Sequence, residues 1–136
     1  GEGEGEGILD YDMILQRTVS GPYVPGGTVD VTLSYTYTGS EAISAFGVSE
    51  FTPPGWSFVE FVSGSEPVAM PNPDETGELG FAWIYPPAIP GGFTYRLRVP
   101  QTAVGPQTME GYVIYRTLNP ELRSNTRVTI INPAAK

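Results

Sequence analysis

The stretch from Thr28 to Thr38, TVDVTLSYTYT, decides the fold class of this chain. Every second residue from Val29 to Tyr37 is apolar or aromatic, and the residues between them are Thr, Asp or Ser. A strict period of two is the pattern of a β-strand that buries one face and exposes the other. A helix would need a period near 3.6, so this stretch predicts a half-buried strand.

Working outward from it, seven further segments have strand character and are separated by turns rich in Gly and Pro. The longest irregular stretch runs from Ser63 to Glu78, and no segment predicts a helix longer than one turn. Two antiparallel sheets that face each other across an aromatic core are the simplest arrangement of such segments. The seven segments are Tyr11–Val19, Ile43–Phe51, Trp56–Val62, Leu79–Tyr85, Phe93–Val99, Thr108–Thr117 and Arg123–Asn132.

Composition supports this class and excludes several others. The 136 residues suit one domain, and 17 glycines with 14 prolines exclude a helical bundle. No window of 18 or more residues is apolar throughout, so no membrane-spanning helix is predicted. The absence of His and Cys excludes His-based catalysis, thiol nucleophiles, disulfides and Cys/His zinc sites. We therefore expect no enzyme activity, no cofactor and no metal centre.

Aromatic residues are concentrated in the predicted strands and supply the candidate core. A filled core explains them, and the alternative is a binding platform on the surface. The core candidates are Trp56, Phe81, Trp83, Phe93 and Tyr95.

Charge is unevenly distributed along the chain. The net charge is −8 and the isoelectric point is about 4.3, which argues against nucleic acid as a partner. Residues 1–90 hold thirteen acids and one base, Arg17, whereas residues 91–136 hold two acids and six bases. This polarity favours attraction between copies head to tail, and the alternative is an uneven but solvated surface.

Two stretches resemble the Ig-like repeat modules of bacterial and archaeal surface proteins. The first is PGGTVDVTLSYTYTG at residues 25–39, which resembles the turn that leads into the second strand of those modules. The second is TPPGWSFV at residues 52–59, which resembles a turn between sheet edges. The resemblance covers about residues 18–62. It implies an Ig-like antiparallel β-sandwich, seven to eight strands in all, in an extracellular spacer, stalk or building block, and it brings no catalytic residue.

The sequence also contains residues that could form three other kinds of site: a catalytic carboxylate pair, a Ca²⁺ site or a carbohydrate platform. The carboxylate pairs Asp10/Asp12, Asp74/Glu75 and Glu50/Glu60 have no predicted cleft around them, so surface charge is the simpler interpretation. Residues 72–76, NPDET, offer oxygen ligands for Ca²⁺ but lack the spacing of a dedicated loop, and a loop cap explains them as well. A carbohydrate platform would use Trp83, Tyr85, Tyr112 or Tyr115, which cross-strand packing also explains.

The N-terminal residues, GEGEGEG, motivate the sharpest hypothesis. In a strand the glutamates would share one face, and the glycine face would allow close backbone approach. We expect the segment from Gly1 to about Leu15 to add as a strand to a sheet of the next copy, or else Tyr11–Val19 to be the domain's own first strand after a linker. The predicted assembly residues are Glu2, Glu4, Glu6, Ile8, Leu9, Met13 and Leu15 in the donor, and Arg96, Arg98, Arg116 and Arg123 in the acceptor.

The sequence therefore predicts an all-β chain with a low-complexity tail or donor segment at residues 1–10 and an Ig-like β-sandwich at residues 11–136. The predicted function is a non-enzymatic structural subunit of an extracellular filament or surface stalk, whose partners are copies of itself or neighbouring repeat domains. The alternative is a carbohydrate- or Ca-binding adhesion module. We expect a location outside the cell or on its surface, with no nucleic acid partner and no membrane insertion.

Overall fold

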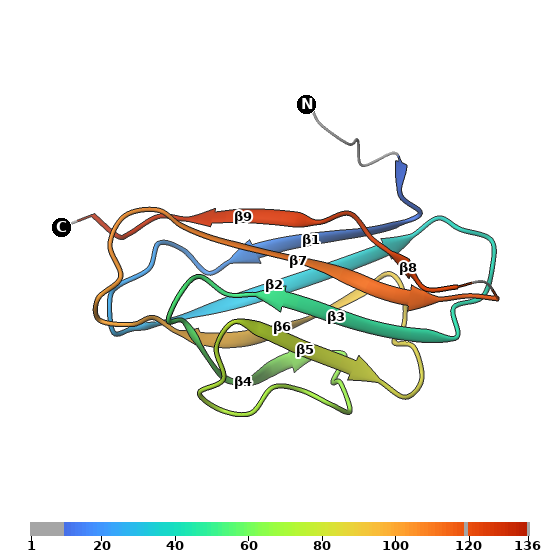
Figure 1. The fold of residues 1–136 in the computed structure, drawn as a ribbon, viewed down its shortest axis with the longest axis horizontal. Coiled ribbons are helices and arrows are strands. Elements are labelled where there is room, and N and C mark those ends of the chain that lie inside the picture. Colours follow the sequence, from blue (N-terminus) through green and yellow to red (C-terminus); the bar gives the residue numbers. More distant parts are fainter. Residues whose placement is uncertain (1–9, 119, 136) are drawn as a thin grey trace.

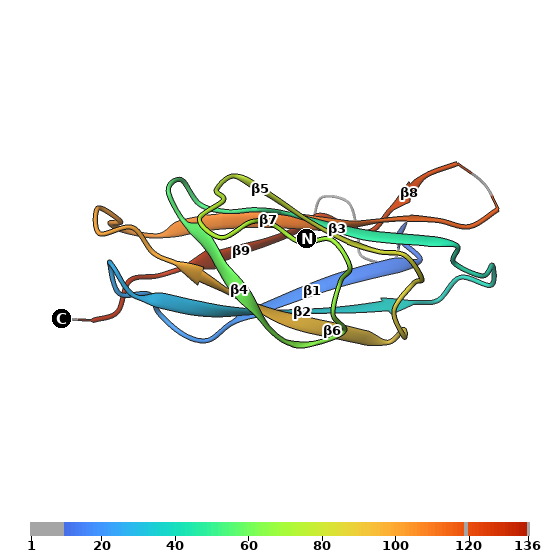
Figure 2. The same cartoon turned by 90° about the horizontal axis from the view of Figure 1, so that it is seen from below.

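The computed structural model describes residues 10–118 and 120–135, which form two antiparallel sheets facing each other (Figures 1 and 2). One sheet has the strand order β1-β2-β6-β4, with β1 at Met13–Val19, β2 at Thr28–Tyr37, β6 at Gly91–Arg98 and β4 at Ser57–Gly64. The other has the order β5-β3-β7-β8, with β5 at Glu78–Trp83, β3 at Ala45–Phe51, β7 at Gln107–Arg116 and β8 at Leu122–Arg123. β9, at Arg127–Ile131, also pairs with β7. The predicted β-sandwich is confirmed, and the described residues include no helix of the length and apolarity needed to cross a membrane.

The predicted strand from Arg123 to Asn132 is in fact two strands. β8 and β9 are separated at Ser124 and Asn125, whose side chains are buried. Ser124 Oγ accepts a hydrogen bond from the Val113 amide at 2.8 Å and donates one to the Asn125 carbonyl at 2.8 Å. Buried polar groups must be paired, and here that pairing interrupts the sheet. The described residues accordingly form nine strands, where seven to eight were predicted.

β2 is the strand that the sequence specified most clearly, and it runs through the middle of its sheet. Val29, Val31, Leu33 and Tyr35 are buried, and the residues between them face outward. Its antiparallel register with β6 places Val31 opposite Tyr95 and Leu33 opposite Phe93. Strand pairing therefore brings two of the predicted core aromatics onto the same inner face.

The core is a continuous aromatic cluster between the two sheets. The ring of Phe81 lies 5.0 Å from that of Phe93 and 5.1 Å from that of Tyr95, centroid to centroid. Trp56 is fully buried, whereas Trp83 is only partly buried, with its ring 5.6 Å from Phe93. Such tilted and edge-on pairs contribute beyond their buried area. The predicted core is confirmed for four of its residues, and Trp83 lies at the margin.

On one side of the sandwich, residues 65–77 cover the outer strands of both sheets. The Phe58 amide in β4 donates to the Glu75 carbonyl at 2.9 Å, and the Asp74 amide donates to the Phe58 carbonyl at 2.8 Å. In β5, Ala82 exchanges main-chain hydrogen bonds with Ala69. An unpaired sheet edge is a template for another strand, so this irregular segment protects the β4 and β5 edges.

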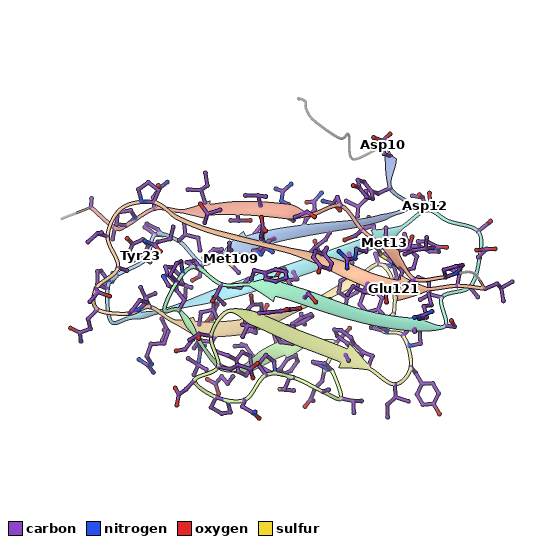
Figure 3. The ribbon with its side chains drawn as sticks, viewed as in Figure 1. Asp10, Asp12, Met13, Tyr23, Met109 and Glu121 are labelled. Atoms are coloured by element: carbon purple, nitrogen blue, oxygen red, sulfur yellow. The ribbon has the colours of Figure 1, made fainter. Side chains whose placement is uncertain are left out.

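The two ends of the sandwich differ in charge. The acidic pole comprises the start of β1, the β2–β3 loop, the turn at residues 84–90, and residues 117, 118, 120 and 121. Figure 3 places Asp10, Asp12 and Glu121 at this end and Tyr23 at the opposite end. The uncharged pole comprises residues 20–27, 52–56, 99–106 and 132–135, which contain no Asp, Glu, Lys or Arg. β1 and β9 both run from the acidic pole to the uncharged pole (Figure 1).

Candidate functional site

The structure narrows the predicted donor segment. Met13 and Leu15 are fully buried in the chain's own β1, where they lie opposite Tyr37 and Tyr35 of β2. These two residues therefore belong to the core of their own domain, because their inward face is needed to complete it, and this placement corrects the extent of the donor. The remaining predicted donor residues, Glu2, Glu4, Glu6, Ile8 and Leu9, lie outside the described residues.

The four predicted acceptor arginines do not form one patch. Arg96 and Arg98 share the outer face of β6, and Arg96 already contacts Asp30 at 2.7 Å and Glu60 at 2.6 Å. Arg116 and Arg123 belong to the other sheet, on β7 and β8. The fold therefore does not bring the four predicted acceptor residues together, because they lie on two different sheets. Arg116 lies 3.8 Å from Glu121, and Arg123 lies over the ring of Tyr112 at 4.4 Å.

Opposite the covered edges, β1 and β9 stand side by side as the outer strands of their sheets, and side chains rather than main-chain pairing join them. We call this junction the seam. The Asn125 side chain accepts a hydrogen bond from the Leu15 amide at 2.7 Å and donates to the Leu15 carbonyl at 3.2 Å. Arg17 donates from Nη1 to the Arg127 carbonyl at 3.0 Å and to Thr129 Oγ1 at 2.9 Å. These contacts close one part of the seam without a strand between the sheets.

The remaining part of the seam is open toward the uncharged pole. A groove of about 440 Å³ lies there between residues 17–22 and residues 129–132. The Leu15 main chain faces the seam, and strand geometry then points the main-chain groups of Arg17 and Val19 the same way. Arg127 Nε is buried near this junction and has no hydrogen-bond partner within the described residues. The groove thus presents the edge of a strand, while Arg127 lies outside its lining.

A buried ion pair lies just inside the seam and connects the two sheets. Arg17 of β1 and Glu50 of β3 both have fully buried side chains, and Arg17 Nε donates to Glu50 Oε1 at 2.9 Å while Nη2 pairs with Oε2. Tyr95 of β6 donates its hydroxyl proton to the same Oε1 at 2.8 Å. Burial raises the pKa of Glu50, and the bonds from Arg17 and Tyr95 oppose that rise. Burial, followed by the nearby Glu50 charge, raises the pKa of Tyr95 well above its ordinary value.

Sequence reasoning missed this pair, although one signal for it was present. The alternation of β1 places Arg17 on the same inward face as Met13 and Leu15. A base on a buried face requires a carboxylate partner, but the sequence does not say which of its fifteen acids supplies it. The sequence instead suggests that Glu50 and Glu60 are both surface charges. That interpretation is wrong for Glu50, because Glu50 faces the core, whereas Glu60 contacts Arg96 on the outer face.

Two further hollows lie on the surface. A shallow trough of about 510 Å³ on the outer face of the five-stranded sheet has a floor that includes Gly47, Gly80 and Ala82, with Ile114 beside it. A groove of about 520 Å³ lies at the uncharged pole, lined by residues 23–25, 101, 103–105 and 133–135. The Tyr23 hydroxyl donates to the Gly105 carbonyl at 2.6 Å beneath this second groove. Both hollows are largely apolar, which is typical of surfaces that contact proteins.

The residues considered for sugar or Ca²⁺ are dispersed or already bonded. Trp83 and Tyr115 pack inward, with Trp83 against Phe46 at 5.2 Å and Tyr115 against Tyr37 at 5.7 Å, centroid to centroid. The Glu75 carboxylate accepts a hydrogen bond from the Asn72 amide at 2.9 Å, as the loop-cap interpretation predicted. Within residues 10–118 and 120–135, no group of three or more acidic side chains is arranged to hold a metal ion.

Comparison with known proteins shows the fold alone. No family model matches the chain, and no curated protein sequence matches it. A cohesin module from a Clostridium perfringens family 33 glycoside hydrolase superposes with a TM-score of 0.58 at 7% identity, covering 90% of this chain and 97% of that one. The sixth cohesin of Acetivibrio cellulolyticus scaffoldin B, solved with a dockerin, gives 0.53 at 12% identity, with coverages of 91% and 99%. The collagen-binding domain of a Staphylococcus aureus adhesin gives 0.52 at 6% identity, with coverages of 85% and 96%. The chain thus has the β-sandwich fold found in these bacterial domains.

Proposed function

We propose that this chain is a non-enzymatic structural module of an extracellular filament or surface stalk, in which copies join head to tail by strand addition. The observation that carries the proposal is the unequal protection of the sheet edges. Residues 65–77 cover β4 and β5, whereas the seam between β1 and β9 is open toward the uncharged pole. In the proposed assembly, residues 1–9 of one copy enter the seam of the next.

The length and charge of this donor suit the seam. Nine extended residues span about 30 Å, whereas the open part of the seam beside residues 129–132 covers four residues, or about 13 Å. Glu2, Glu4 and Glu6 would meet no acidic residue among those that line this groove. A donor that leaves the acidic pole of one copy and enters the uncharged pole of the next runs parallel to β1 and β9. Main-chain bonds would supply the affinity, and Ile8 and Leu9 the apolar anchors.

Deletion of residues 1–9 tests the proposal. We expect the full chain to form concentration-dependent polymers in sedimentation velocity, and the shortened chain to remain monomeric. Val19→Pro in the full chain should also give monomers, because it removes a seam-facing N–H at a sheet edge where proline is tolerated. The control is Gln16→Pro, which removes an N–H that faces β2 and should lower the melting temperature as well. Unchanged polymers in both the shortened chain and Val19→Pro would rule out strand addition.

The trough on the outer face of the five-stranded sheet favours a second candidate, an adhesion module that binds a protein partner. The structural neighbours include a collagen-binding domain and a cohesin solved with a dockerin. Gly80→Arg should block such binding without unfolding the chain, because a Cβ at Gly80 meets no atom within 4 Å. Immobilised collagen is the probe: retention of the parent chain and loss of at least tenfold in affinity for Gly80→Arg would support adhesion, and no retention of either would count against it.

A further inference from the structure

An apolar tip projects from the acidic pole at the turn between β5 and β6. Ile84 and Tyr85 at this tip are 67% and 82% exposed. The whole turn, IYPPAIP at residues 84–90, contains no charged residue. Three prolines restrict its backbone, so little conformational freedom remains to be lost when it binds. A large, rigid aromatic side chain held in water is the kind of residue that anchors protein interfaces.

The groove at the uncharged pole has the complementary character. Its volume of about 520 Å³ lies within the range of about 300–1,000 Å³ that is usual for cavities that hold small organic groups. Val24 and Val104 stand at its rim and are 57% and 78% exposed. Gln101 also lines it and offers a polar partner for a phenol hydroxyl. Among the described residues, neither the groove nor the loops around it contain an acid or a base.

We propose that the Ile84–Tyr85 tip of one copy inserts into the groove at the uncharged pole of the next copy. This contact deepens the proposed function and rests on its head-to-tail direction. Tip and groove lie at opposite ends of the sandwich, so one chain cannot bring its own two surfaces together. A contact between two different surfaces of identical chains does not close and therefore propagates.

Charge and placement both favour this direction of assembly. Two acidic poles would bring together Asp10, Asp12, Glu41 and Glu121 of each copy, which outnumber the nearby cations Arg116 and Arg123, whereas an acidic pole meets no like charge at the uncharged pole. The open end of the seam lies at the same pole as the groove, because residues 17–22 lead directly into Tyr23. The proposed contact and the proposed strand addition therefore use the same two poles and the same direction of assembly.

Cysteine crosslinking tests the contact directly, because the chain has no cysteine of its own. We expect the double variant Tyr85→Cys/Val104→Cys to form a ladder of disulfide-linked oligomers under mild oxidation. Each single variant should stop at a dimer, and a mixture of the two single variants should give the mixed dimer in preference. The control pair is Tyr85→Cys/Ser34→Cys, since Ser34 is an exposed residue within β2, on the outer face of the four-stranded sheet, and lines neither the groove nor the seam. Equal ladders from the two pairs would reveal random collision and overturn the proposal.

A second measurement separates this contact from strand addition. Tyr85→Ser should lower the association constant of the full chain at least tenfold, and Ser34→Ala, on the outer face of β2, should leave it within about twofold. The crosslinking is repeated after deletion of residues 1–9. A ladder that survives this deletion supports the pole contact even if strand addition fails. If Tyr85→Ser leaves the polymers unchanged and the cysteine pair forms no ladder, the contact between tip and groove is refuted. Strand addition would then remain as the explanation of the polymers.

Discussion

Replacing Arg17 with methionine is expected to lower the free energy of unfolding by about 3–5 kcal/mol. The substitution removes the cation from a carboxylate that is fully buried and leaves Glu50 with only the Tyr95 hydroxyl as a partner. It also removes the donor to the Arg127 carbonyl, which joins β1 to β9. Urea denaturation followed by tryptophan fluorescence measures the loss.

A double-mutant cycle shows whether the loss arises from the pair. Arg17→Met combined with Glu50→Gln should recover more than half of the lost stability, because the amide oxygen still accepts the Tyr95 proton and no buried charge remains. The matched control is Arg96→Met, which removes an arginine that also contacts two carboxylates but lies on the outer face. Its effect should be much smaller, since exposed pairs are screened by water. Equal losses for the two single variants would mean that Arg17 and Glu50 are not paired in the core.

The second large effect is expected from Gly111→Ala, which should cost about 3 kcal/mol. Gly111 is buried on β7, next to the ion pair. A Cβ at this position would lie 2.7 Å from the Ser49 carbonyl oxygen and 2.8 Å from Arg17 Nη2, and it would also meet the Glu50 carboxylate. One of these contacts is main chain and cannot rotate away, so the added methyl group must displace the pair or separate β3 from β7.

Gly80→Ala supplies the control for this prediction. Gly80 lies on β5 of the same sheet, and a Cβ there meets no atom within 4 Å. Alanine at this position should change the free energy of unfolding by no more than about 0.5 kcal/mol, because alanine reduces the freedom of the unfolded chain without a clash. Thermal melts of the two variants measured side by side give the comparison. A Gly111→Ala variant as stable as Gly80→Ala would contradict the tight packing around the ion pair.

The two sides of the sandwich differ in how their edge strands are protected. On one side the chain covers its own edge strands with residues 65–77, and on the other it relies on the side chains of Arg17 and Asn125. Arg17 therefore has two roles, since it neutralises Glu50 in the core and joins the seam at the surface. A module that associates through its edges needs one edge protected and another available. The structure has this asymmetry, on which the proposed assembly depends.

The candidate site was only partly accessible from the sequence. The sequence predicts a donor strand at the Gly-Glu tail, which stays a prediction. It extends that donor to Met13 and Leu15, because their alternation looks the same whether the partner strand is internal or external. Alternation places Arg96 and Arg98 on one face of a strand, but it does not say whether Arg116 and Arg123 are their neighbours, and the fold puts those two on the other sheet. The sequence predicts Tyr85 only as one of several aromatic residues that could form a carbohydrate platform. Its high exposure, which distinguishes it from Trp83 and Tyr115, is evident only in the structure.

By itself, the sequence determined the class of fold and the positions of most strands. The alternation in β2 and β6 and the Gly- and Pro-rich turns are local properties, and each segment encodes its own buried face. Only the tertiary structure decided the partners, because they come from distant parts of the chain. Arg17 meets Glu50 33 residues away, and Asn125 reaches Leu15 across 110 residues. Which strands become outer edges, and where the tip and groove lie, depends on how the sheets pair, which no single segment encodes.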